Sequence, residues 1–90
     1  MTENLRLRED IQWREAGGEV IALDLGGGQY LSVNRSGALL WPMLQAGTSA
    51  AALVDRLVTA FGVPPERARA DVDALLALLD AENLLVREPS

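Results

Sequence analysis

The side chains of this sequence that could do chemistry are hydroxyls and carboxylates, and the hydroxyls lack the partners that catalysis needs. Ser32, Ser36, Thr48 and Ser49 carry hydroxyls, but the 90 residues include no His and no Cys. A serine nucleophile needs a neighbouring base, usually His, and Cys and His are also the usual zinc ligands. We therefore expect no catalytic residue in this chain and no metal site.

Three acidic side chains, Asp71, Asp73 and Asp80, fall within one predicted helix. Paired carboxylates can exchange protons or bind a divalent cation. At about 100° per residue, however, Asp71 and Asp73 point about 200° apart and do not converge on one ion. The triplet Gly26-Gly27-Gly28 resembles a phosphate-binding loop only in its glycines, because no Lys follows and a strand comes next. We expect a solvated acidic face, a hairpin turn and no cofactor.

The composition favours one small globular domain. Of the residues, 49% are hydrophobic, and 8 Arg against 13 acids give a net charge of −5. An acidic surface repels phosphate, which argues against nucleic acid or an anionic membrane as partner. No apolar run could cross a bilayer, and the N-terminus lacks the basic and apolar segments of a signal peptide. We expect a single cytoplasmic domain over residues 1–90, ordered over about 5–86.

The first part of the chain has the two-residue period of β-strands. The apolar residues of its first strand all have odd numbers, namely Leu5, Leu7, Ile11 and Trp13. Gly17-Gly18 supplies the positive φ angles of a tight hairpin. A second strand over residues 19–25 alternates two sets, Ile21, Leu23 and Leu25 against Val20, Ala22 and Asp24. With a third strand over residues 29–34, the pattern predicts a three-stranded antiparallel meander with one apolar face.

The second part has the period of helices. Asn34 or Ser36 can cap a first helix that Gly47 ends, and Pro42 within it costs about 3 kcal/mol unless the helix kinks. A second helix lies between Thr48-Ser49 and Gly62. A third begins at Pro64-Pro65, runs to about Glu82, and has one apolar stripe made of Ala68, Val72, Leu75, Leu76 and Leu79. Leu84-Leu85-Val86 can add a short extended segment, and we expect residues 88–90 to be loose.

Two tryptophans and one strand edge remain as binding candidates. Trp13 and Trp41 can line a ligand pocket, but in a chain with so few aromatic residues we favour core anchors. The third strand contains neither charge nor Pro over residues 30–34, whereas charged residues crowd the first strand. Exposed edges are normally protected by charge, Pro or a cover. If this strand lies at an edge, it can pair with an extended peptide, unless a helix or a second copy covers it.

An ordered set of motifs resembles the PqqD-like family of precursor-recognition domains. The matching segments are residues 20–24 (VIALD), 28–34 (GQYLSVN), 37–41 (GALLW), 53–57 (LVDRL), 61–63 (FGV) and 71–76 (DVDALL). Together they cover roughly residues 10 to 86, and they are most similar to the stand-alone leader-binding version found in lasso peptide clusters. The resemblance implies an α+β, winged-helix-like fold of a three-stranded antiparallel sheet followed by a three-helix bundle. Pro42 departs from the family pattern.

The resemblance also implies a function. A leader peptide of a ribosomally made precursor would add as a strand beside the third strand, against the third helix. The strand residues implicated in this way are Gln29, Tyr30, Leu31, Ser32, Val33 and Asn34. The helix residues implicated are Arg69, Val72, Asp73, Leu76 and Asp80. We expect a non-catalytic adaptor whose partners are the leader region and a leader peptidase or maturation enzyme of the same cluster.

Two other functions stay open on the sequence. One is an accessory role that presents a precursor to a radical SAM enzyme of quinone-cofactor maturation, through the same groove. The other is a winged-helix DNA-binding domain, which would need a basic recognition face. The third helix argues against DNA, because its two arginines, Arg67 and Arg69, lie among four acids.

Overall fold

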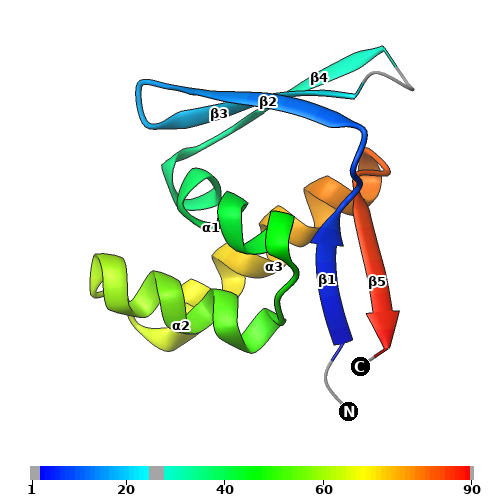
Figure 1. The fold of residues 1–90 in the computed structure, drawn as a ribbon. Coiled ribbons are helices and arrows are strands. Elements are labelled where there is room, and N and C mark those ends of the chain that lie inside the picture. Colours follow the sequence, from blue (N-terminus) through cyan, green and yellow to red (C-terminus); the bar gives the residue numbers. More distant parts are fainter. Residues whose placement is uncertain (1–2, 25–27, 90) are drawn as a thin grey trace.

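The computed structural model, which describes residues 3–24 and 28–89, has a sheet on one side of three helices and a separate two-stranded ribbon (Figure 1). The sheet has the order β2 (Ile11–Ala16), β3 (Glu19–Asp24), β4 (Gln29–Val33). The helices are α1 (Arg35–Ala46), α2 (Ala50–Phe61) and α3 (Pro65–Ala81). The ribbon pairs β1 (Glu3–Leu7) with β5 (Leu85–Pro89). This architecture confirms the predicted α+β, winged-helix-like class.

The first strand was predicted as one element, and this is wrong, because it is divided between two sheets. Leu5 and Leu7 are 1% and 5% exposed and belong to β1, whose neighbour is the C-terminal strand β5. The chain then turns near Glu9, and β2 joins the other sheet. The apolar residues of both strands have odd numbers, so the hydrophobic pattern shows no break, although in β2 Ile11 is only half-buried and Trp13 is 38% exposed. The C-terminal segment is corrected too, because Glu88 and Pro89 are part of β5.

The buried face of the sheet is the opposite of the one that the longer side chains suggest. Val20 and Ala22 are each 1% exposed, whereas Ile21 and Leu23 are each 38% exposed. Ala22 is in register with Trp13, whose ring packs on fully buried Trp41 with centroids 6.1 Å apart. This aromatic pair fixes the inner face of the sheet against α1. Both faces of the sheet therefore carry apolar side chains; Leu25 lies outside the described residues.

The helix boundaries follow the capping residues. The Asn34 side chain accepts a hydrogen bond from the Gly37 N–H at 3.1 Å, so Asn34 rather than Ser36 caps α1. The helix continues through Pro42 to Ala46. Ser49 caps α2 in the same way, and Gly62 ends it in the left-handed region. None of the helices in the described residues has the length and apolar character to span a bilayer.

The core joins the three helices to the inner face of the sheet. The predicted stripe of α3 is confirmed, because all five of its residues are buried. Gly37, near the start of α1, lies where β4, α1 and α3 meet. A Cβ atom there would be 2.1 Å from Val33 Cγ1 and 3.3 Å from Leu75 Cδ1. The end of β4 is therefore held close to both helices by a residue that has no side chain.

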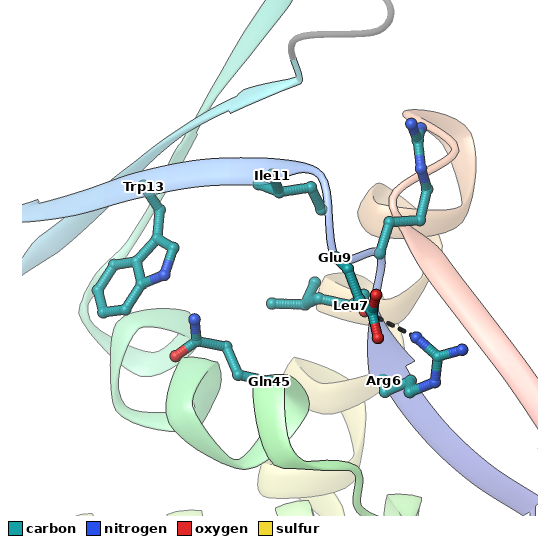
Figure 2. Close-up of a pocket in the computed structure, with 7 residues that line it drawn as sticks. Arg6, Leu7, Glu9, Ile11, Trp13 and Gln45 are labelled. Atoms are coloured by element: carbon teal, nitrogen blue, oxygen red, sulfur yellow. Dashed lines mark hydrogen bonds between the residues drawn. The ribbon is translucent and has the colours of Figure 1, made fainter.

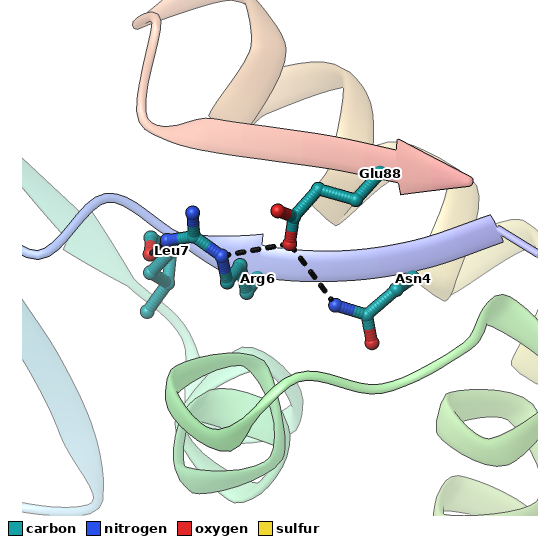
Figure 3. Close-up of polar contacts among 4 residues, drawn as sticks. All are labelled: Asn4, Arg6, Leu7 and Glu88. Atoms are coloured by element: carbon teal, nitrogen blue, oxygen red, sulfur yellow. Dashed lines mark hydrogen bonds and ion pairs between the residues drawn. The ribbon is translucent and has the colours of Figure 1, made fainter. Parts of the chain in front are cut away.

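The terminal ribbon is bonded to the helical part of the fold along β1. Leu5 in β1 exchanges two backbone hydrogen bonds with Thr48, at 2.7 and 2.9 Å, on the side away from β5. Across the ribbon, the Glu88 carboxylate accepts hydrogen bonds from Arg6 Nε at 2.9 Å and from Asn4 Nδ2 at 3.3 Å (Figure 3). The bond from Arg6, and after it that from Asn4, lowers the pKa of Glu88 below its ordinary value.

Candidate functional site

The backbone of β4 forms one edge of the sheet, and the β2–β3 turn determines which of its groups face outward. Ala16 and Glu19 are in register across a two-residue turn in which Gly17 and Gly18 have φ angles of 61° and 82°. These angles are those of a type I′ turn, which closes on a hydrogen-bonded pair. The backbone groups of Glu19 therefore face β2.

Backbone direction alternates along a strand, so the turn fixes the parity of the whole sheet. The groups of Val20 and Ala22 face β4, where their register partners are Val33 and Leu31. The backbone groups of Leu31 and Val33 are thus used within the sheet, and those of Tyr30 and Ser32 point outward. Each of these two residues presents one N–H and one C=O at the open edge.

This edge has no cover within the part of the chain that the structure describes. Among the described residues, no segment outside the sheet accepts or donates a backbone hydrogen bond at Tyr30 or Ser32. The strand, QYLSV, also carries no charged residue. The expected edge position of the third strand is thereby confirmed, and its unpaired groups form a template for another extended chain.

A groove of about 380 Å³ lies beside this edge, between β4 and α3. From the β4–α1 junction it is lined by Ser32, Val33, Asn34, Ser36, Gly37 and Leu40. Leu57 of α2 also contributes, and α3 provides Arg67, Asp71, Ala74, Leu75 and Leu78. The wall formed by α3 has one residue of each charge at its N-terminal end and apolar residues along the rest. The groove therefore suits a peptide that is mainly apolar where it meets the helix.

The strand residues predicted from the family resemblance divide between two places. Ser32, Val33 and Asn34 line the groove. Leu31 is half-buried against the core, and Gln29 pairs with Asp24 through the backbone. Tyr30 lies on the outer face of the sheet, where its side chain is 76% exposed. The strand as a whole is thus part of the site, but its side chains face two different surfaces.

The helix residues predicted from the resemblance are not among those that line the groove. Val72 and Leu76 are 1% and 6% exposed and belong to the core. Asp80 accepts a hydrogen bond at 2.6 Å from Arg87 of β5, and Arg69 and Asp73 are exposed. At about 100° per residue, these five positions form a stripe roughly opposite the one that lines the groove.

A signal in the sequence could have located the stripe of α3 that lines the groove. The groove-lining positions Arg67, Asp71, Ala74 and Leu78 recur at spacings of four and three, directly beside the core stripe. Leu78 is apolar but lies outside that core stripe, and it is 38% exposed. An apolar helix residue without a core partner is a candidate for binding. The packing of α3 in the bundle determines which of the stripes beside the core stripe faces β4. The periodicity of the sequence does not specify that packing.

A second hollow lies under the bend between β1 and β2 (Figure 2). Trp13 and Ile11 of β2, Leu7 of β1 and Gln45 of α1 point toward it, and Arg6 also contributes to its lining. Its volume is only about 140 Å³, which is too small for a peptide strand. The described residues also contain no group of three or more acidic side chains placed to bind a metal ion. The β4 edge and its groove are therefore the better candidate site.

Comparisons with known proteins agree on the fold. A structure described as TbiB1 in complex with the TbiA(beta) leader peptide superposes with a TM-score of 0.80 at 22% identity, covering 89% of this chain and 93% of that one. A structure of lasso peptide synthetase B1 complexed with the leader peptide gives 0.77 at 27% identity, covering 91% and 96%. No curated protein sequence matches significantly. The sequence profile of coenzyme PQQ synthesis protein D (PqqD) matches residues 19–85, so the chain belongs to the PqqD family.

Proposed function

We propose that this chain is a leader-binding adaptor, which binds the leader segment of a ribosomally made precursor peptide as an added strand on β4. The leader then lies in the groove between β4 and α3, and the core of the precursor is presented to a separate enzyme. The observation that carries this proposal is the uncharged, unpaired edge at Tyr30 and Ser32 beside the groove. The protein itself is non-catalytic, and its lack of His and Cys agrees with that role.

Simple energetics assign different tasks to the edge and the groove. The four outward backbone groups of Tyr30 and Ser32 can contribute about 0.5–1.5 kcal/mol each, or about 2–6 kcal/mol together. A micromolar complex needs about 8 kcal/mol in addition to the entropy lost on association. Each leucine-sized side chain buried in the groove adds about 1.5–3 kcal/mol. Backbone pairing therefore aligns the leader, and apolar contacts with Leu75 and Leu78 decide which leader binds.

A lasso peptide system is the context that we favour. The lasso peptide synthetase B1 structure holds a leader peptide and is 27% identical to this chain over nearly its whole length. In that context the adaptor serves a leader peptidase and a cyclase from the same gene cluster. The cluster partners, like the precursor, would be encoded next to the gene for this chain.

The PqqD family description favours a second candidate, the presentation of a precursor to a quinone-cofactor maturation enzyme. The same edge and groove would be used, because strand addition does not depend on what happens to the precursor later. The two candidates differ in the neighbouring genes. A short peptide gene beside a peptidase and a cyclase supports the lasso role, whereas one beside a radical SAM enzyme supports the quinone role.

Binding is tested with the leader segment of the neighbouring precursor gene, made as a labelled synthetic peptide. Leu78→Asp places a carboxylate in the apolar part of the groove, and we expect at least about tenfold weaker binding by fluorescence anisotropy. Phe61→Asp is the matched control, because Phe61 is also apolar, helical and exposed, at 44%, but does not line the groove. Equal affinities of the two variants would contradict leader binding in this groove.

A further inference from the structure

The outer face of the sheet carries apolar side chains that the fold does not bury. Ile21 and Leu23 of β3 are each 38% exposed and Tyr30 of β4 is 76% exposed; we call these three residues the outer patch. They line a shallow hollow of about 390 Å³ together with Gln12, Trp13 and Arg14 of β2. An antiparallel sheet with helices on one face normally presents polar residues on the other. The outer patch therefore needs a separate explanation.

The strand register arranges the outer face in two rows that both lead to the open edge. Gln12, Leu23 and Tyr30 are consecutive partners in the first row. Arg14, Ile21 and Ser32 are consecutive partners in the second row. Tyr30 and Ser32, which end these rows, are also the residues whose backbone groups point outward.

A strand added to β4 would extend both rows. A guest residue that exchanges hydrogen bonds with Tyr30 or Ser32 lies directly opposite it, so its side chain projects from the same face of the sheet. Guest residues between these positions project into the groove on the inner face. One bound peptide thus presents alternate side chains to two surfaces of this protein, the groove and the outer face.

We propose that the outer patch is the second half of the peptide site and binds the outward-pointing side chains of the added strand. This inference rests on the proposed function and defines its ligand class. The ligand is an extended segment with apolar residues both at the positions that face the groove and at those that face the outer patch. The small side chain of Ser32 leaves room for a large guest residue, which lies opposite Ser32, to reach Ile21. Opposite Tyr30, the guest residue packs along the phenol ring.

The position of the outer patch favours the bound peptide over other occupants. It is continuous with the β4 edge, so a guest strand reaches it without any further contact. A stable protein interface buries about 800 Å² on each partner, far more than three partly exposed side chains supply. A second copy of this chain would also bring its own net charge of −5 against this one.

The test uses a displayed library of random peptides of strand length, selected on the wild-type protein. A synthetic peptide made from the best clone is scanned with alanine. We expect alanine to weaken binding both at groove-facing and at outward-facing apolar positions of the peptide. At the outward-facing positions the affinity should fall about fivefold to tenfold. In Tyr30→Ser and Leu23→Ser, the outward positions lose their effect and the groove-facing positions keep theirs. Phe61→Ser is the control and leaves both sets unchanged.

The other outcomes separate this inference from the proposed function. If the scan shows only groove-facing positions, the outer patch is not part of the peptide site, while strand addition stands. If no clone is selected, or if Ser32→Pro binds the clones normally, strand addition itself is wrong. If light scattering shows a dimer that Tyr30→Ser separates, the outer patch is an interface between copies and the inference is overturned.

Discussion

The outer edges of β1, in the terminal ribbon, and of β4, in the three-stranded sheet, differ in their hydrogen bonding. In β1, the outward backbone groups of Leu5 are bonded to Thr48, and the side chain is buried. In β4, the outward groups of Tyr30 and Ser32 have no such partner among the described residues. Strand β2 forms the other edge of the same sheet, but it carries Arg14 and Glu15. The edge of β4 has neither such charges nor a cover among the described residues, so it is the edge that suits binding.

Proline substitution gives the sharpest form of this comparison. Leu5→Pro and Ser32→Pro each remove an outward amide, but only the amide of Leu5 has a partner, the Thr48 carbonyl at 2.7 Å. We expect Leu5→Pro to prevent folding, and Ser32→Pro to stay folded by circular dichroism while losing leader binding. Leu5→Ala separates the side-chain part of the loss, which is about 2–5 kcal/mol.

The neighbouring position in β4 serves as an internal control. The amide of Leu31 faces β3, so Leu31→Pro breaks the ladder opposite Ala22 and should destabilise the protein by more than about 2 kcal/mol. Denaturant unfolding measures this loss. If Ser32→Pro is destabilised as much as Leu31→Pro, the assignment of outward and inward backbone groups is contradicted; if only Ser32→Pro is destabilised, the assignment is reversed.

Gly37 tests how the open edge is held in place beside the groove. In Gly37→Ala, the new Cβ would overlap Val33 Cγ1, so β4 and α1 must move apart. We expect a loss of about 1–3 kcal/mol in denaturant unfolding and weaker leader binding. Ala70→Gly, at an exposed position of α3, controls for binding: it costs about 1 kcal/mol of helix propensity but should leave the affinity for the leader unchanged. A stable Gly37→Ala variant with full affinity would mean that this close approach does not position the groove.

The smallest expected effect lies in the terminal ribbon formed by β1 and β5. Because Arg6 lowers the pKa of Glu88 in the folded state, the stabilising effect is present above the unfolded carboxyl value. It is lost as the pH falls through the lower folded value. A carbon-detected NMR titration should place the pKa of Glu88 below the ordinary value of a glutamate, and Arg6→Gln should raise it. Arg56→Gln should leave the pKa of Glu88 unchanged, and an ordinary glutamate pKa in the wild type would contradict the pairing.

The elements of the fold were largely predictable because each has a local cause. Asn34, Ser49 and Gly62 mark helix ends through hydrogen bonds and φ angles that the residue types themselves favour. The division of the first strand was not predictable, because the apolar residues of β1 and β2 all have odd numbers and the alternation runs through the bend without a break. Its partner, β5, lies at the other end of the chain, and such pairing leaves no local pattern.

The edge position of β4 was predictable from the sequence, but the stripe of α3 that lines the groove was not. An uncharged strand of five residues is visible in the sequence, and its place at the edge follows from a meander. Which stripe of α3 faces that strand depends on how the helix is rotated in the bundle. Alternation alone also could not choose between Val20 and Ile21 for the core; the contact between Trp13 and Trp41 decided it.

Amide hydrogen exchange measured residue by residue tests the open edge most directly. In the free protein, we expect the amides of Tyr30 and Ser32 to exchange fast, and those of Leu31 and Val33 to exchange slowly within the same strand. Addition of the leader peptide should slow the amides of Tyr30 and Ser32 and leave the exposed edge of β2 unchanged. Slow exchange at Tyr30 and Ser32 before any peptide is added, or protection that appears at β2 instead, would contradict strand addition at β4.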